Sequence, residues 1–325
     1  MSEVTIGCYG LKGHQIHGSA SRLERARLTA MSGIDEETFE KQKEAIGDEV
    51  VFYPDIESFL ASDVDLVSFC SSRRDEQASQ TIQALKAGKH VLAEKPMATN
   101  RADLDALAAA VEESGKSLWT MTSMVYYPPI KGLKAVVESG VIGDVVQVYC
   151  MKSYPYHDRR PQDRGIDGGI IQAAIHAVSV IGHITGQSFA EIFAQDTGKG
   201  NPKDGEFQMA MNMACRLDNG TLAAIVANYC NPRGIGYHGN DQVRFHGTNG
   251  MIELVDGSSR RMLVINEEDP REFENDDGDP KYPQDIINSI LDGTPTLLTQ
   301  EDGFRYTEAV IRAHESVEQG RPLGV

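Results

Sequence analysis

Short apolar runs alternate with amphipathic stretches along the first 122 residues. The runs have the length and composition of buried strands, and they cover residues 4–9, 27–31, 50–52, 65–70, 90–93 and 117–121. Residues 75–87 show helical spacing and end at Gly88, a typical C-terminal cap. Asn100 is the expected N-cap of a further helix, whose apolar face is formed by Leu104, Leu107, Ala108 and Val111. Strands that alternate with helices in this way predict an α/β domain with a doubly wound parallel sheet.

The pattern changes after residue 123, where longer segments alternate between apolar and polar positions. These segments cover residues 144–153, 207–217, 221–229, 242–247 and 251–255. Two of the intervening turns contain Asn-Gly, at Asn219 and Asn249, which is a strong hairpin signal. An apolar helix is expected over residues 169–185, an acidic loop over 276–280, and closing helices over 284–291 and 302–318. We therefore predict a second, α+β domain with an open, mainly antiparallel sheet, and we place the two domains at residues 1–122 and 123–325.

Length, charge and cysteine content narrow the class of protein. A chain of 325 residues fits two domains, and a net charge of −17 repels phosphate backbones, which argues against general nucleic-acid binding. No apolar run approaches the ~20 residues of a membrane span, and the first residues do not read as a signal peptide. The cysteines are scattered, which favours reduced thiols in a cytoplasmic protein and offers no metal knuckle; they are Cys8, Cys70, Cys150, Cys215 and Cys230.

The turn after the first predicted strand is rich in glycine but departs from a known phosphate-binding pattern. Lys12 and Gln15 stand where a dinucleotide fingerprint, G-x-G-x-x-G, has its second and third glycines. The charge of Lys12 could still hold a phosphate. A turn without a ligand remains the alternative, and the candidate cofactor contacts are Gly10, Leu11, Lys12 and Gly13.

Small residues follow the second predicted strand. Ser32 and Gly33 stand where dinucleotide-binding sheets place the carboxylate that holds the ribose 2′-hydroxyl of NAD, and the first carboxylate here is Asp35. A 2′-phosphate would fit there, with Lys41 or Lys43 as the countercharge. We therefore expect NAD(P) as the cofactor, with a slight preference for NADP. The alternative is a plain turn in which Asp35 caps the next helix.

Glu94, Lys95 and Pro96 follow the fifth predicted strand directly. Proline restricts the backbone before it, so the Lys95 side chain has a defined direction at the carboxyl end of the strand. Beside a cationic nicotinamide ring, repulsion between like charges would favour loss of its proton. Such a lysine suits a proton carrier or a donor to a substrate oxygen, although a surface lysine in a turn is the alternative. Glu94, Lys95 and Pro96 are also candidate cofactor contacts, as are Ser71 and Ser72 after the fourth strand.

These features together resemble the Gfo/Idh/MocA family of NAD(P)-dependent oxidoreductases. The glycine-bearing first turn, the Glu94-Lys95-Pro96 motif and the later Gly-Gly-x-x-x-x-x-x-His helix carry the resemblance, which extends over nearly the whole chain and includes residues 247–254. It implies a Rossmann dinucleotide-binding domain, then a substrate-binding and oligomerisation domain whose last helix could pack back on the first. It also implies a sugar, inositol or related polyol as substrate, and a sister subunit on the open sheet, as in a homodimer or homotetramer.

The apolar helix carries one polar stripe, which Gln172, His176, Ser179 and His183 form at steps of four, three and four. A buried polar stripe needs hydrogen-bonding partners, which a ligand cavity or a neighbouring element could supply. We favour a cavity for Gln172 and His176, and packing for the other two. By resemblance, His176 matches the family's catalytic histidine. Gln172 stands where the family often has aspartate, so it can orient a substrate hydroxyl but cannot act as a base.

Two tyrosines replace an arginine that the family commonly has in the segment at residues 123–128. Tyr126 could stack on a sugar or a nicotinamide ring, and we expect Tyr127 to be a core aromatic residue.

A loop between the second domain's first strand and its apolar helix is a candidate rim of the site. It carries His157 and Arg159 as candidate substrate contacts. Arg159 or Arg160 could fix a carboxylate or phosphate of the substrate. An ion pair with Asp158 or Asp163 is the alternative.

The residues together predict a cytoplasmic dehydrogenase that acts on CH–OH groups. Hydride would pass between the nicotinamide ring and a carbinol carbon of the substrate. His176 would take the hydroxyl proton, and Lys95 would polarise that oxygen or serve as the alternative base. This mechanism requires Lys95 and His176, from different domains, to converge beside the cofactor. The alternatives are a cofactor-recycling, sugar-cleaving enzyme of the same family and a non-catalytic dinucleotide or sugar sensor.

Overall fold

The computed structural model describes residues 2–158 and 160–325, and the chain forms two compact units. The first unit contains the chain up to Met121 together with Asp279–Phe304, and the second contains Thr122–Gly278 together with Arg305–Val325. The segment Asp279–Phe304 belongs to the first unit because Ile286 and Ile287 are buried in that unit's apolar core. The resemblance suggests a return of the last helix only, and the local sequence pattern does not show that the whole segment Asp279–Phe304 joins the first unit. The domain limits at residue 122 remain a prediction.

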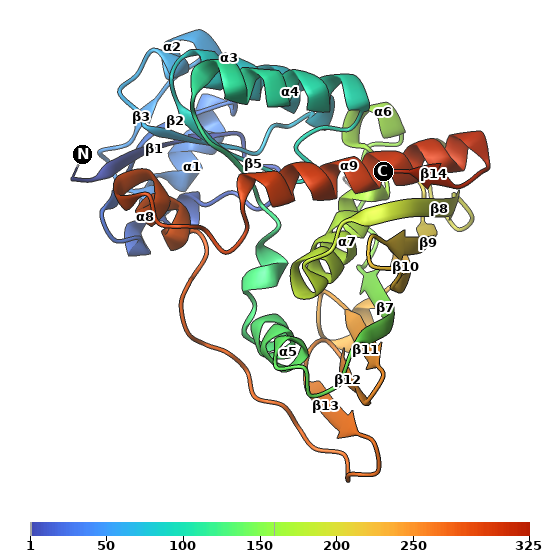
Figure 1. The fold of residues 1–325 in the computed structure, drawn as a ribbon. Coiled ribbons are helices and arrows are strands. Elements are labelled where there is room, and N and C mark those ends of the chain that lie inside the picture. Colours follow the sequence, from blue (N-terminus) through green and yellow to red (C-terminus); the bar gives the residue numbers. More distant parts are fainter. Residues whose placement is uncertain (1, 159) are drawn as a thin grey trace. The chain divides into compact units, whose positions relative to one another are not determined.

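The first unit is built on one parallel sheet (Figure 1). Its strand order is β3-β2-β1-β4-β5-β6, and every neighbouring pair is parallel. Because the order runs outward from β1 in both directions, the sheet is doubly wound, as the alternation of strands and helices predicts. The strands are β1 (Val4–Tyr9), β2 (Ala26–Ser32), β3 (Val51–Phe52), β4 (Leu66–Phe69), β5 (His90–Ala93) and β6 (Leu118–Thr120).

The helices of the first unit begin and end largely where sequence signals place them. They are α1 (Glu36–Ile46), α2 (Ile56–Leu60), α3 (Arg74–Lys86), α4 (Arg101–Ser114) and α8 (Gln284–Asp292), and Figure 1 shows α3 beside α4. Asn100 caps α4 as expected, since its side chain accepts a hydrogen bond from the backbone N–H of Asp103. Ala110 is buried on α4 in place of Ala108, which is exposed, so the expected apolar face is wrong at that position.

The connection between β1 and β2 contains a short 3-10 helix, η1 (His17–Arg22), in place of a long α-helix. Its residues include Gly18, Ser19 and Ser21, which are weak helix formers. The loop before it, which carries the candidate cofactor turn, is fixed by the Gln15 side chain. That amide donates hydrogen bonds to the carbonyl oxygens of Tyr9, Gly10 and Ser68, at 3.3, 2.9 and 3.0 Å.

The second unit contains an eight-stranded sheet with the order β13-β12-β11-β7-β10-β9-β8-β14. All pairs are antiparallel except β7 with β10, so the prediction of a mainly antiparallel sheet is confirmed. Both Asn-Gly turns join antiparallel neighbours, β9 to β10 and β11 to β12. The strands are β7 (Val145–Ser153), β8 (Phe189–Thr197), β9 (Ala210–Leu217), β10 (Leu222–Asn228), β11 (Gln242–Gly247), β12 (Gly250–Val255), β13 (Arg260–Ile265) and β14 (Leu323–Gly324).

A buried helix, α7 (Ile171–Thr185), packs against β7 and β10 of this sheet. All of its residues from Ile171 to Ile184 are buried. The segment Arg164–Thr185 is long and apolar enough to cross a membrane, but 83% of its apolar 18-residue window is buried, as in a core helix. The remaining elements are η2 (Ser123–Tyr126), α5 (Pro128–Glu138), α6 (Arg164–Asp167), η3 (Arg233–Ile235) and α9 (Gln300–Gln319), and the boundary between the units falls inside α9.

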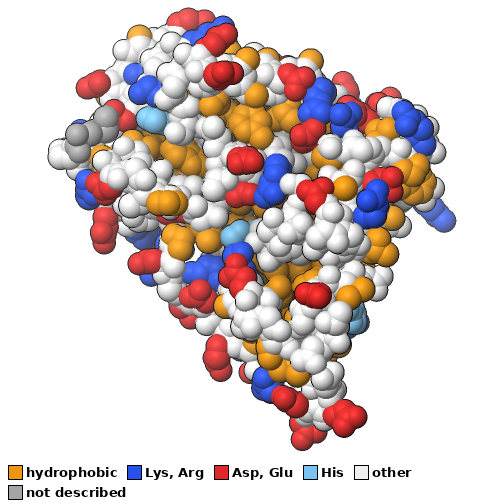
Figure 2. Space-filling view, in the orientation of Figure 1, with side chains coloured by type: hydrophobic (Ala, Val, Ile, Leu, Met, Phe, Trp, Pro, Cys, Tyr) orange, Lys and Arg blue, Asp and Glu red, His pale blue; other side chains and the backbone are white. Residues whose placement is uncertain are grey.

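The surface reflects the acidic composition. Figure 2 shows Asp and Glu side chains spread over the face in view and mixed with Lys and Arg. Four of the five cysteines are buried and Cys230 is exposed, and all five are free thiols, in keeping with the expectation of reduced cysteines.

Candidate functional site

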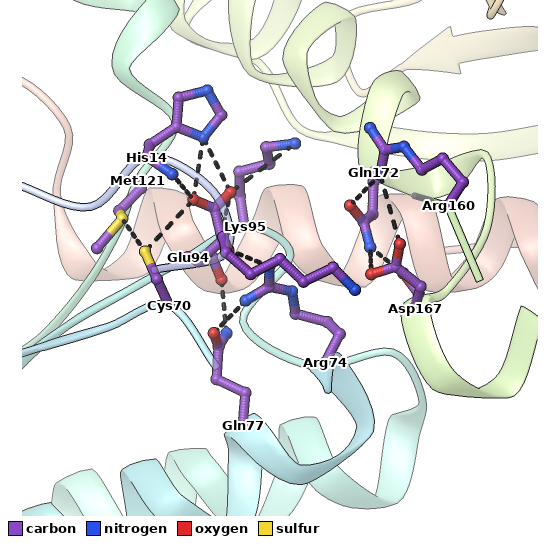
Figure 3. Close-up of polar contacts among 11 residues, drawn as sticks. His14, Cys70, Arg74, Gln77, Glu94, Lys95, Met121, Arg160, Asp167 and Gln172 are labelled. Atoms are coloured by element: carbon purple, nitrogen blue, oxygen red, sulfur yellow. Dashed lines mark hydrogen bonds and ion pairs between the residues drawn. The ribbon is translucent and has the colours of Figure 1, made fainter. Parts of the chain in front are cut away.

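The carboxyl ends of β1, β4 and β5 lie side by side in the parallel sheet, and Glu94 directly follows β5. The Glu94 side chain is 2% exposed. Its two carboxylate oxygens lie 2.9 and 3.0 Å from Nδ1 of His14, and the backbone N–H of His14 donates to the same carboxylate (Figure 3). The backbone N–H of Lys95 donates to Oε1 at 3.2 Å. One buried carboxylate therefore joins the turn after β1 to the end of β5.

The electrostatic surroundings keep Glu94 ionised. Burial by itself raises the pKa of its carboxyl group, but the charge and hydrogen bond of His14, followed by the charges of Lys95 and Arg74, outweigh burial and lower the pKa to about 2. A carboxylate with so low a pKa does not exchange protons at neutral pH. Glu94 is therefore suited to holding neighbouring groups in place, and not to acting as an acid or base.

The Lys95 side chain is also withdrawn from solvent. It is 7% exposed, and its Nζ lies 3.9 Å from Oε1 of Glu94. Pro96, which follows through a cis peptide bond, is buried. Lys95 and Glu94 thus form a buried ion pair directly after the central strand β5. Open α/β sheets bind their ligands at the carboxyl ends of such strands.

Arg74 and Gln77, at the start of α3, connect the turn after β1 with the Glu94-Lys95 segment after β5. Arg74 is 3% exposed, donates to the amide oxygen of Gln77, and donates to the backbone oxygen of Lys12 at 3.2 Å. The Gln77 amide donates to the backbone oxygen of Glu94 at 2.6 Å. These bonds fix the relative position of the first turn and the Glu94-Lys95 segment.

The first turn has the backbone that a close approach requires. Gly10 has a φ of +69°, and a Cβ there would lie 2.3 Å from the backbone oxygen of Cys70. Gly13 has a φ of +132°, and a Cβ there would lie 2.3 Å from Oε2 of Glu94. Both glycines are therefore required by the fold of this turn. Leu11 is half-buried, and the ammonium of Lys12 donates to the backbone oxygen of Ser72 at 3.1 Å.

The other predicted cofactor residues occupy neighbouring strand ends. Ser32 is fully buried at the end of β2, Gly33 follows with a φ of +70°, and the carboxylate of Asp35 accepts a hydrogen bond from Thr38 at the start of α1. Lys41 and Lys43 pair with Glu37 and Glu40 on the same helix. Ser71 is buried and its hydroxyl lies 2.5 Å from the side-chain oxygen of Gln80, while Ser72 is exposed.

In the second unit, Gln172 is the centre of a buried polar network. Its amide nitrogen donates to the backbone and side-chain oxygens of Asp167, and its amide oxygen accepts from Arg160 at 2.9 Å (Figure 3). Arg160 also lies 3.4 Å from the carboxylate of Asp167 and over the ring of Tyr229. The ion pair of Arg160 with Asp158 or Asp163, considered from sequence, is therefore wrong, because α6 presents Asp167 to it.

His176 is buried on α7, one turn after Gln172, and its ring meets that of Tyr154 edge-on at 6.1 Å. Ser179 donates to the backbone oxygen of His176, in keeping with a packing role. Tyr126 is half-buried in η2, whereas Tyr127 is 50% exposed, so its expected core position is wrong.

The rim loop that carries His157 is described except at one position. The His157 ring stacks on that of His238 at 5.4 Å. Arg159 lies outside the described residues.

The structure adds residues that the sequence reasoning missed. His14 is the clearest, since it lies in the first turn and binds Glu94 across 80 residues of chain. Arg74, Gln77 and Asp167 are likewise buried polar residues in these two networks. One sequence signal could have indicated this contact. His14 follows β1 and Glu94 follows β5, and the doubly wound strand order brings the carboxyl ends of these two strands close together.

Two sequence families match successive parts of the chain. The one described as "Oxidoreductase family, NAD-binding Rossmann fold" matches residues 3–122, and the one described as "GFO/IDH/MocA C-terminal domain" matches residues 130–253. Myo-inositol 2-dehydrogenase of Thermotoga maritima is 26% identical over 322 residues, which cover 93% of this chain and 92% of that protein.

Solved structures share the fold along the whole chain. The aldose-aldose oxidoreductase of Caulobacter crescentus, in complex with glycerol, aligns with a TM-score of 0.84 at 20% identity and covers 99% of this chain and 100% of its own. The WlbA dehydrogenase of Bordetella pertussis, in complex with NADH and UDP-GlcNAcA, aligns with a TM-score of 0.79 at 17% identity and covers 99% and 98%. The protein is thus a member of the Gfo/Idh/MocA family of oxidoreductases, with an NAD-binding Rossmann domain and the family's C-terminal domain.

Proposed function

We propose that the protein is a dehydrogenase that transfers a hydride between NAD(P) and a hydroxyl-bearing carbon of a sugar, inositol or related polyol. The observation that carries the proposal is Lys95, a buried lysine beside the ionised Glu94 at the carboxyl end of β5 in an NAD-binding domain. The relative from Thermotoga maritima, which is named a myo-inositol 2-dehydrogenase, supports the substrate class.

The residues of the first turn fit a dinucleotide. Gly10 and Gly13 allow the turn to pack closely against Cys70 and Glu94 at the carboxyl edge of the sheet, and Lys12 supplies a positive charge that would attract a phosphate. The bound cofactor would supply the hydride acceptor or donor. Lys95 would donate a hydrogen bond to the substrate oxygen and so favour the alkoxide-like charge that develops as the C–H bond breaks. Glu94 would hold the lysine in that position.

For the second unit, we propose that His176 takes the hydroxyl proton of the substrate and that Gln172, Tyr126 and His157 contact the substrate. Gln172 is already held by Asp167 and Arg160, so its amide has a fixed orientation. That Lys95 and His176 meet at one site remains a prediction of the sequence analysis. Assembly as a homodimer or homotetramer is likewise a proposal, which light scattering would test.

The experiment that tests the reaction follows nicotinamide absorbance with a panel of aldoses, inositols and related polyols. Lys95→Ala should reduce turnover at least about 100-fold, since a positioned acid–base group contributes that much, and should change NAD(P)H affinity far less. Lys89→Ala, directly before β5, is the matched control because the Lys89 ammonium bonds outside this site, to the backbone oxygen of Ser62. Equal losses of turnover and cofactor affinity in Lys95→Ala would contradict the catalytic role. Product formed without net change in absorbance would instead favour a cofactor-recycling, sugar-cleaving enzyme, and ligand binding without product would favour a sensor.

We further propose a preference for NADP over NAD. Ser32 and Gly33 place no carboxylate at the end of β2, and Asp35 is engaged as the N-cap of α1. Fluorescence titration with NADH and NADPH tests this preference, and tighter binding of NADH would refute it.

A further inference from the structure

Arg160 is fixed by buried groups on one side of its guanidinium. Nη1 donates to the amide oxygen of Gln172 at 2.9 Å and lies 3.4 Å from the carboxylate of Asp167, and the guanidinium carbon lies 4.8 Å from the centre of the Tyr229 ring. Figure 3 shows the contacts of Arg160 with Gln172 and Asp167. Among residues 2–158 and 160–325, which the structure describes, no group accepts a hydrogen bond from Nε or Nη2 of Arg160. Since the side chain is 20% exposed, these two nitrogens are available to a ligand.

Two more cations of the second unit, Lys152 and Arg233, act together with Arg160 on the ring of His238. Burial, followed by the charge of Lys152, lowers the pKa of His238. The charge of Asp241 opposes this lowering of the pKa, and the charges of Arg160 and Arg233 add to it. The ring is therefore neutral at pH 7 and has one N–H to donate. Because His238 and Arg233 are exposed, this cationic region is accessible from solvent.

A group of aromatic rings joins this cationic region to His176. The ring of Tyr154 lies 5.0 Å from that of His238 and 6.1 Å from that of His176. It also stacks on the Tyr229 ring at 6.4 Å, and Nζ of Lys152 lies 4.9 Å from its centre. All of these residues belong to the second unit. The cations therefore lie beside the histidine that we propose to take the substrate proton.

The two carboxylates that pair with these cations are on the buried side. Asp167 is 2% exposed beside Arg160, and Asp241, which bonds to Lys152, is 10% exposed. The three cations and two carboxylates leave one net positive charge, in a chain whose net charge is −17. Buried carboxylates that hold exposed cations in place leave positive charge facing the ligand, and such a region attracts anions. Nε and Nη2 of arginine lie side by side and match two oxygens of a carboxylate or phosphate.

We propose that the substrate is an acidic sugar or polyol, whose carboxylate or phosphate binds to Nε and Nη2 of Arg160 and accepts a further hydrogen bond from His238. The inference rests on the dehydrogenase proposed above and names the substrate class of that same site. The anionic group takes no part in the reaction, since hydride leaves from a separate CH–OH carbon. Its role is to fix the orientation of the substrate through a charged pair at a distance from the carbon that is oxidised.

The test compares each aldose of the panel above with its uronate and with its 6-phosphate. In the wild type we expect kcat/KM to be at least about 10-fold higher for one acidic form than for the neutral sugar, and the better form identifies carboxylate or phosphate as the anion. Arg160→Gln should lower this ratio by about 10- to 100-fold. Arg271→Gln is the matched control, because it removes an exposed cation of the same unit that pairs with Glu268.

The ratio separates binding of the anion from an indirect effect through Gln172. If Arg160 only held Gln172 in place, Arg160→Gln would lower kcat/KM equally for neutral and acidic sugars, and an unchanged ratio would overturn the proposal. A wild type without preference for either acidic form would also overturn it. Arg160→Lys keeps the charge but not the paired donors, so it should retain part of the ratio. A ratio as low as that of Arg160→Gln would contradict a role of the charge.

A binding measurement keeps the inference separate from the proposed function. Calorimetric titration of the same uronates and 6-phosphates into the wild-type protein with NAD(P)H should show tighter binding than for the neutral sugars. This binding should weaken as NaCl is raised from about 50 to about 500 mM, because salt screens an accessible ion pair. Salt-sensitive binding in a protein that oxidises none of the sugars would contradict the proposed dehydrogenase but not the anion site. Equal turnover of neutral and acidic sugars would support the dehydrogenase and overturn the anion site.

Discussion

The stability of the first unit should depend on the ionisation of Glu94. The ordinary carboxyl pKa of 4.5 falls to about 2 in the folded protein. A depression of this size corresponds to about 3 kcal/mol of stabilisation, since each pKa unit is worth about 1.4 kcal/mol. Because the folded pKa is the lower one, this contribution is fully present above pH 4.5 and is lost as the pH falls toward 2.

Glu94→Gln removes the charge and nearly preserves the shape. We expect it to lower the free energy of unfolding by about 3 kcal/mol at pH 7, and the gap between wild type and variant to shrink as the pH falls from about 5 to 2. Urea unfolding of both proteins across this pH range measures the gap. Carboxylates that both proteins share titrate equally and cancel in the difference.

A matched control distinguishes the effect of the buried charge at Glu94 from the general effect of removing one negative charge from the protein. Glu113→Gln, on the exposed face of α4, removes one negative charge from a protein whose net charge is −17 and should change stability by less than about 0.5 kcal/mol. If Glu94→Gln were as stable as the wild type at pH 7, or if the gap stayed constant down to pH 2, the assignment of Glu94 as an ionised, hydrogen-bonded carboxylate would be wrong.

Two other substitutions test the turn and the second unit. Gly10→Ala should destabilise the protein by about 1–3 kcal/mol, because the backbone is left-handed and the new Cβ would meet the backbone oxygen of Cys70. The control is Gly18→Ala, since a Cβ at Gly18 would have no neighbouring atom within 4 Å. Thermal unfolding compares the two variants, and equal melting temperatures would contradict the prediction. Lys152→Met should cost about 3–5 kcal/mol, because it strands the buried carboxylate of Asp241, to which the lysine bonds. Adding Asp241→Asn should restore part of the loss in urea unfolding, and no recovery would argue against a coupled pair.

Local sequence signals predicted the elements well where one segment carries the whole signal. The β1 strand follows from its short apolar run. The Asn100 cap and the two Asn-Gly hairpins follow from a few consecutive residues, since their hydrogen bonds join residues that are close in sequence. Some elements were missed. β8 and β13 were not predicted, because buried and exposed positions do not alternate strictly along them and the local signal is weaker.

The candidate site was predictable in part. The sequence placed Lys95 and Glu94 at the end of a central strand, because a strand followed by Glu-Lys-Pro is a local pattern. It could not assign the partner of Glu94, since His14 is 80 residues away and several polar residues follow the first strand. Similarly, Arg160 had three aspartates within reach along the chain, and only the position of α6 selects Asp167.

By itself, then, the sequence determined most of the elements, the doubly wound sheet and a lysine directly after one of its central strands, because the pattern of apolar and polar residues along each segment reflects which side chains are buried. Tertiary structure alone decided that Asp279–Phe304 joins the first unit, that His14 binds Glu94, and that Gln172 is held by Asp167 and Arg160. Buried polar groups need hydrogen-bonding partners, and buried apolar side chains need a core to pack against. In these cases the partners lie far away in the sequence, so only the packing of distant segments determines which residues meet.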